Sequence, residues 1–167
     1  RREAEKSLEE NERKHQLIFE TLTDVIFSLD AQGRITYLSP QFENITGYRI
    51  KDIYGRPYMD IIDPEYHERV MKMFQQGLSG KDVPMYRMDI VAADGRRIPV
   101  EINAKTVWDS AGRPIGRIGV GRDLTQRLEV EAALRESEEK FRVLADSTPT
   151  AIMRGISQHP ELLLALA

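Results

Sequence analysis

The stretch ADGRRIPVEINAKTVWDSAGRPIGRIGVGRDLT, residues 93–125, contains two strands joined by a glycine turn. Strict alternation along a segment predicts a strand with one buried and one solvated face. Residues 97–108 alternate in this way, and Glu101 and Asn103 lie on the polar face. The other face carries Ile98, Val100, Ile102, Ala104 and Thr106. The turn DSAG leads into a second strand, 113–123, in which glycines alternate with bulky apolar residues and allow a close approach of another backbone or ligand.

Three further strands are predicted outward from this stretch. Segments 24–30, 34–39 and 84–92 are short and rich in β-branched or aromatic residues. The turns AQGR, ADGR and SAGR each place a glycine between two strands. A helix is predicted over 63–78, with Asp63 as its N-cap and Pro64 in its first turn. Five antiparallel strands with helices between the second and third predict an α+β domain of about 100 residues.

Composition excludes several classes of function. The chain has 167 residues, 41% of them hydrophobic, and a net charge of −3, so no basic surface for nucleic acid is expected. There is no cysteine, which removes disulfides, thiolate metal sites and cysteine nucleophiles. No apolar run approaches the roughly 20 residues that span a bilayer. We expect a cytoplasmic protein and no membrane contact by this chain.

Residues 1–22 predict a charged helix with a coiled-coil seam. Hydrophobic residues recur at alternating spacings of four and three, which is the a/d pattern of paired helices. We therefore expect a homodimer formed through the flanking helices, whether parallel or antiparallel. Its seam consists of Leu8, His15, Ile18 and Leu22. The same rhythm continues in 126–148, which predicts a second helix.

The two terminal segments also share letters. SLEENERKHQLIFETLTDVIF, residues 7–27, aligns with ALRESEEKFRVLADSTPTAIM, residues 133–153. This echo indicates one unit of a tandem array, divided into an entry helix (1–22), a sensor domain (23–125) and an exit helix that leads into a next repeat (126–148). Residues 149–167 are expected to be a truncated or disordered tail.

The middle of the chain resembles the PAS family over about residues 14–127. The resemblance rests on DVIFSLDAQGRITYLSPQFENITGY (24–48), the D-G-x-x-I-P-V-E strand (94–101) and the terminal Asp123-Leu124-Thr125. It implies a sheet of order 2-1-5-4-3 with helices on one face. It also implies a sensor that acts through its flanking helices on an output domain, and we expect a histidine kinase. Asp123 and Thr125 would form the signalling junction, with Arg127 as a partner for Asp123.

The resemblance also implies a cavity between the sheet and the helices. We expect its lining to include Met71, Phe74, Met88, Ile102 and Ile118. A flavin held as a cysteine adduct is excluded, because cysteine is absent. Haem is disfavoured because its usual histidine position falls on Arg69, two residues after His67, and non-covalent flavin is disfavoured as well.

The cofactor is therefore unknown, and no metal site and no catalytic residue are expected in this chain. Two functions remain open. The first is a sensor that responds to a small ligand, and the second is a ligand-free dimerisation and spacer module.

Overall fold

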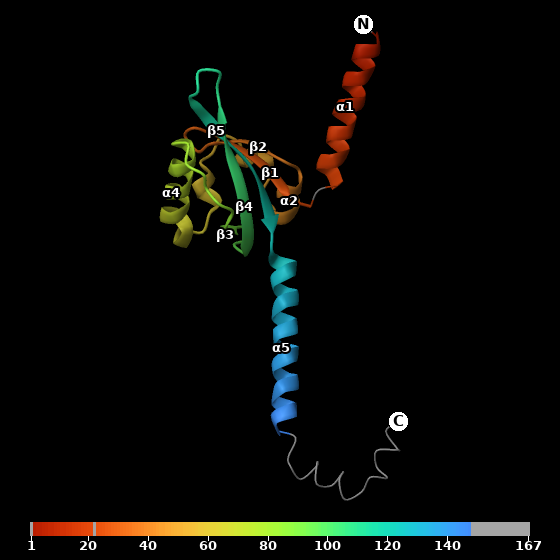
Figure 1. Cartoon of the computed structure of the whole chain (residues 1–167), viewed down its shortest axis with the longest axis vertical. Coiled ribbons are helices and arrows are strands. Elements are labelled where there is room, and N and C mark those ends of the chain that lie inside the picture. The colour runs from red at the N-terminus through yellow and green to blue at the C-terminus, as the bar shows by residue number, and fades with distance from the viewer. Residues whose placement is uncertain (1, 22, 148–167) are drawn as a thin grey trace, which may run out of the picture. The chain divides into compact units, whose positions relative to one another are not determined.

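The computed structural model describes residues 2–21 and 23–147, with the side chains of residues 15–21 and 147 left out. Strands and helices alternate much as the sequence predicts (Figure 1). The helices are α1 (Arg2–Thr21), α2 (Gln41–Thr46), α3 (Ile50–Ile53), α4 (His67–Leu78) and α5 (Thr125–Ser147), with 3₁₀ turns η1 (Tyr58–Ile61) and η2 (Pro64–Tyr66). The strands are β1 (Val25–Asp30), β2 (Ile35–Leu38), β3 (Tyr86–Val91), β4 (Arg97–Trp108) and β5 (Pro114–Asp123).

The five strands form one antiparallel sheet of order β2-β1-β5-β4-β3, which confirms the expected topology. The segment from α2 to α4 lies over one face of this sheet (Figure 1). The central neighbours are β1 and β5, where Val25 is paired with Gly121. The first and last strands of the domain therefore lie side by side.

Glycine turns join the hairpins because each turn needs a left-handed backbone. Gly33, Gly95 and Gly112 have φ values of +79°, +84° and +74°. A side chain at such a position is strained, so glycine is the residue of choice. In the last hairpin the carboxylate of Asp109 also accepts backbone hydrogen bonds from Ala111 and Arg113, both at 2.9 Å. These local bonds set the register of the strands.

The helical segment that begins at Asp63 has two parts. The expected single helix over 63–78 is instead the 3₁₀ turn η2 followed by α4. Asp63 does act as the N-cap, because its carboxylate accepts a hydrogen bond of 3.0 Å from the backbone N–H of Glu65. Its second oxygen lies 2.7 Å from Nε of Arg97 at the start of β4. The cap therefore also holds the helical segment to the sheet.

The core lies between the sheet and the overlying helices. Alternate residues of β4 are buried, as the alternation predicts. Almost fully buried side chains come from each layer, including Ile35 on β2, Ile53 on α3 and Val70 on α4. Leu124, directly after β5, is 1% exposed, and its N–H donates to the carbonyl of Pro99. Leu124 thereby fixes the end of the last strand against β4.

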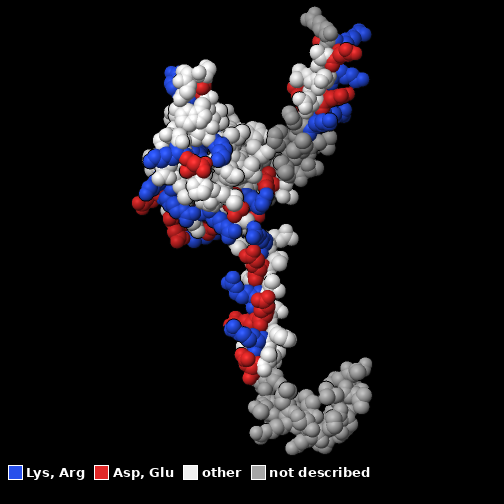
Figure 2. All heavy atoms as spheres, viewed as in Figure 1, with Lys and Arg blue, Asp and Glu red and all other residues white. Residues whose placement is uncertain are grey.

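Helix α5 has one charged side and one apolar side. Ion pairs at a spacing of four residues join Arg127 to Glu131 and Glu136 to Lys140. Large apolar side chains on this helix are exposed, namely Val130 (62%), Leu134 (59%) and Phe141 (75%). Figure 2 shows the charged residues gathered along one side of the helix. None of the helices within the described residues is long and apolar enough to cross a membrane.

Candidate functional site

A cavity of about 100 Å³ lies between the inner face of the sheet and the helical layer. Its walls are mostly aliphatic and aromatic. Three residues of the expected lining, Phe74, Met88 and Ile102, are among them. Phe74 of α4 also contacts Tyr58 of η1, with ring centroids 5.2 Å apart. The inner face of β4 and the facing side of α4 therefore enclose this space, as the resemblance implies.

Met71 and Ile118 do not line the cavity. Their side chains are each 47% exposed, so the expected lining needs correction at these two positions. Ile118 is exposed because it lies on the outer face of β5. The inner face of this strand carries Gly119, because a Cβ there would lie 2.7 Å from the ring of Phe27 and 2.8 Å from the Cβ of Ala104. At position 119 the inner layer accepts only glycine, and the neighbouring Ile118 lies on the outer face of the strand.

The inward positions of β5 include a charged residue that sequence analysis missed. Arg117 lines the cavity, and only 5% of its surface is exposed. Its guanidinium donates to the carbonyl of Ala104 (2.9 Å) and to Oγ1 of Thr106 (3.3 Å), both on β4. It passes so close to α4 that a Cβ at Gly77 would coincide with it. The only sequence signal for this placement is that Arg117 lies two residues before Gly119 and therefore shares its face of the strand.

Two tyrosines line the cavity near this guanidinium. Burial, and then the neighbouring Tyr86, raise the pKa of Tyr58 far above its usual value. Burial likewise raises the pKa of Tyr86, although Arg117 opposes the shift. Both phenols therefore stay protonated at neutral pH and remain hydrogen-bond donors. Desolvation by burial lowers the pKa of Arg117, which nevertheless stays charged.

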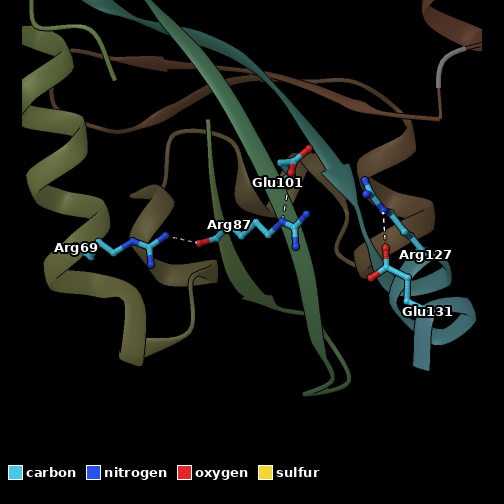
Figure 3. Close-up of polar contacts among 5 residues, drawn as sticks. All are labelled: Arg69, Arg87, Glu101, Arg127 and Glu131. Atoms are coloured by element: carbon cyan, nitrogen blue, oxygen red, sulfur yellow. Dashed lines mark hydrogen bonds and ion pairs between the residues drawn. The ribbon is translucent and has the colours of Figure 1, made fainter. Parts of the chain in front are cut away.

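The histidine and arginine considered for haem have other partners. Nε2 of His67 lies 2.9 Å from the carbonyl oxygen of Ile62. Arg69 donates to the carbonyl of Arg87 on β3 (2.7 Å), and the side chain of Arg87 in turn contacts Glu101 on β4 at 3.3 Å (Figure 3). Among the described residues, no group of three or more His, Cys, Asp or Glu side chains could hold a metal ion.

The end of β5 carries the expected junction. Oδ1 of Asp123 accepts hydrogen bonds from the backbone N–H (2.8 Å) and the hydroxyl (2.6 Å) of Thr125, the first residue of α5. Within α5, Arg127 is paired with Glu131 at 3.1 Å (Figure 3). Asp123 thus holds the first residue of α5 through these two hydrogen bonds.

A second contact near this junction was not foreseen. Asp24 lies just before β1 and forms an ion pair of 3.0 Å with Nη2 of Arg122 on β5. Nε of Arg122 also donates to both oxygens of the same carboxylate. Arg122 directly precedes Asp123, so the chain enters and leaves the domain at adjacent, linked positions. The two residues lie 98 positions apart in sequence, so no local pattern reveals the pair.

The expected dimer seam is described only in part. Leu8 is 60% exposed. The side chains of His15 and Ile18, and Leu22 altogether, lie outside the described part of the chain.

A sheet of this order that carries a helical layer and an inner cavity can be compared with known families. Residues 13–124 match the family described as the PAS fold. The chain belongs to the PAS family. The crystal structure of a sensory box histidine kinase/response regulator from Burkholderia thailandensis E264 superposes with a TM-score of 0.59 at 26% identity. The match covers 78% of this chain and 99% of that one.

Two curated relatives of this PAS domain are named as kinases. The chain is 28% identical over 145 residues to Sporulation kinase C of Bacillus subtilis (strain 168), covering 81% of this chain and 33% of that protein. It is 26% identical over 135 residues to the signal transduction histidine-protein kinase AtoS of Escherichia coli (strain K12), covering 79% and 21%. The chain thus spans a third or less of the length of these two relatives. It corresponds to a PAS sensory domain of the kind found in sensor histidine kinases.

Proposed function

We propose that residues 23–125 form a cytoplasmic sensory domain that regulates a histidine kinase through α1 and α5. The observation that carries this proposal is the arrangement at the junction. The entry to β1 and the exit from β5 are neighbours joined by Asp24 and Arg122, and Asp123 holds the start of α5. A change in the sheet reaches both flanking helices at one place. The kinase relatives support this kind of output. The cytoplasmic location follows from the proposal itself, because a kinase core uses ATP.

In this proposal the cavity holds a small ligand whose presence biases the junction. Gly121, Asp123 and Arg117 lie on the same strand and all line the cavity. Occupation of the cavity therefore acts on the strand that leads directly into α5. Regulation requires only that the ligand bind one state of the domain better than the other.

The junction is tested in a fusion of residues 1–147 to the kinase core of AtoS, joined so that the heptad frame continues. We expect Asp123→Ala to change autophosphorylation at least about fivefold, because a typical coupling free energy of 1–3 kcal/mol corresponds to that factor or more. The matched control is Asp109→Ala. Asp109 accepts two backbone N–H bonds in the same way, but at the turn between β4 and β5. Equal kinase rates in wild type and Asp123→Ala would refute signalling through this junction.

The flanking helices are also proposed to form a homodimer. We expect Leu8→Asp combined with Ile18→Asp to produce monomers, because two carboxylates would then face each other in the seam. The control, Arg2→Gln with Arg13→Gln, changes the net charge by the same amount at outward heptad positions and should remain dimeric. Light scattering of the purified variants measures the mass. A dimer that survives the two aspartates would contradict the seam.

The ligand-free spacer is the second candidate, and the size of the cavity favours it. Ligand pockets usually enclose about 300–1,000 Å³, whereas this cavity encloses about 100 Å³. Under this alternative, α1 and α5 dimerise without any response to small molecules. A screen in which no small molecule raises the unfolding midpoint would support the spacer.

A further inference from the structure

We propose that the cavity binds a short aliphatic monocarboxylate, whose carboxylate group pairs with the guanidinium of Arg117. This inference names a ligand class for the cavity and rests on the proposed sensory function. Four features of the cavity support this ligand class: an uncompensated buried charge, the polar groups around it, the apolar lining and the size of the space.

Arg117 carries a positive charge although it is almost fully buried. A buried cation is costly unless an anion compensates it. Among the described residues, no aspartate or glutamate forms an ion pair with Arg117, and its two hydrogen-bond acceptors, Ala104 and Thr106, are neutral. Those contacts use two of the five N–H donors of a guanidinium. A bound anion would accept hydrogen bonds from the remaining N–H groups of Arg117 and would compensate its charge.

The cavity that Arg117 lines also contains other hydrogen-bond donors. Tyr58 and Tyr86 line the same cavity as Arg117. Within the described part of the chain, neither phenol is hydrogen-bonded to another residue. A guanidinium fork and two phenol donors match the oxygens of a carboxylate, which accepts bidentate hydrogen bonds.

The rest of the cavity lining determines what the ligand can carry besides one carboxylate. Asp123 is the acidic residue that lines the cavity, and it lies six positions along β5 from Arg117, roughly 20 Å away in an extended strand. Its Oδ1 already accepts two hydrogen bonds from Thr125. The walls between are apolar, with Phe27, Val100 and Ile102 among them. An alkyl chain suits these walls, whereas a second carboxylate there would be buried without donors.

The volume of the cavity limits the size of the ligand. The cavity of about 100 Å³ is smaller than the roughly 300–1,000 Å³ of pockets that hold drug-sized ligands. This space accommodates a carboxylate with a chain of a few carbons. It excludes nucleotides, haem and flavins, which are several times larger.

Arg117 also has a purely structural explanation. Gly77 lies in the last turn of α4, where the helix dipole favours a cation. Under that explanation Arg117 stabilises the fold and binds nothing. The two explanations predict opposite changes in stability when the charge is removed, so stability and binding are measured together.

The experiment titrates the full chain with formate, acetate, propionate, butyrate and hexanoate at constant ionic strength. Binding is followed by chemical-shift changes of backbone amides. We expect saturable binding that is strongest at three or four carbons and at least tenfold weaker for propionamide, which has nearly the same shape without the charge. We expect Arg117→Met to weaken propionate binding at least tenfold and to leave the unfolding midpoint equal to or above that of wild type.

The matched control is Lys105→Met. Lys105 is an exposed cation on β4 that pairs with Asp82 at 3.1 Å on the protein surface, so its loss should leave propionate binding unchanged. No binding of any acid, or equal binding of propionamide, would overturn the proposal. Absence of binding together with a lowered midpoint in Arg117→Met would assign Arg117 to the fold alone. A chain that binds no acid but still shows the Asp123→Ala effect in the kinase fusion would refute only the ligand class.

Discussion

Gly116→Ala is expected to destabilise the domain by about 3 kcal/mol, the upper end of the usual cost of overpacking. A Cβ at Gly116 would overlap the carbonyl oxygen of Leu29 and lie 3.1 Å from its carbonyl carbon. Both atoms belong to the backbone of β1, which is paired with β5, so neither can rotate away as the end of a side chain can. The two central strands must therefore separate locally.

The effect of Gly116→Ala is measured by thermal and urea unfolding. We expect the unfolding midpoint to fall by on the order of 10 °C. Gly121→Ala is the matched control on the same strand. A Cβ there would meet Cδ1 of Ile102 at 3.2 Å, and this methyl group can move. We expect Gly121→Ala to cost less than about 1 kcal/mol. Equal midpoints for the two variants would show that β1 and β5 are less tightly fitted than described.

Asp63→Ala is expected to lower the free energy of unfolding by about 3 kcal/mol. The variant loses an N-cap, typically worth about 1 kcal/mol. It also loses a charge-assisted bond to Arg97, worth roughly 1.5–3 kcal/mol where a partner is buried. The side chain of Asp63 is 4% exposed, so solvent screens this bond little. Because Arg97 itself is 60% exposed, no unpaired cation is left in the interior.

Two further variants separate these contributions. Asp63→Asn keeps an oxygen for the N–H of Glu65 but removes the charge, so we expect an intermediate loss. Asp94→Ala removes an ion pair with Arg96 whose two side chains are 57% and 64% exposed, and we expect no measurable loss of stability. Urea unfolding midpoints give the order. A loss for Asp63→Ala as small as that for Asp94→Ala would contradict the role of Asp63 as an anchor between the helical segment and the sheet.

Local features of this fold could be predicted because their causes are local. The alternation in 97–108 matches the bounds of β4, and the glycines of the three turns have the left-handed backbone that such turns require. Asp63 and Pro64 mark the start of the helical segment for the same reason, since capping involves residues only a few positions apart. The strand order followed from the family resemblance, because no local pattern specifies which strands pair across the middle of the chain.

The sequence alone predicted the wrong buried face for β5. In this strand, bulky residues alternate with glycines, and hydrophobicity alone assigns Ile118 to the interior. The tertiary structure reverses that assignment, because Phe27 and Ala104 leave room only for glycine at position 119. The same reversal places Arg117 inside, where it is 5% exposed.

The sequence by itself determined the local elements, the turns, the helix cap and the family, since each depends on neighbouring residues or on a quoted motif. Only the tertiary structure decided which face of β5 is internal, that Asp24 reaches Arg122, and that a charged side chain enters the cavity. These features depend on contacts between segments that are distant in the chain, and the space left by one segment selects the side chain of another.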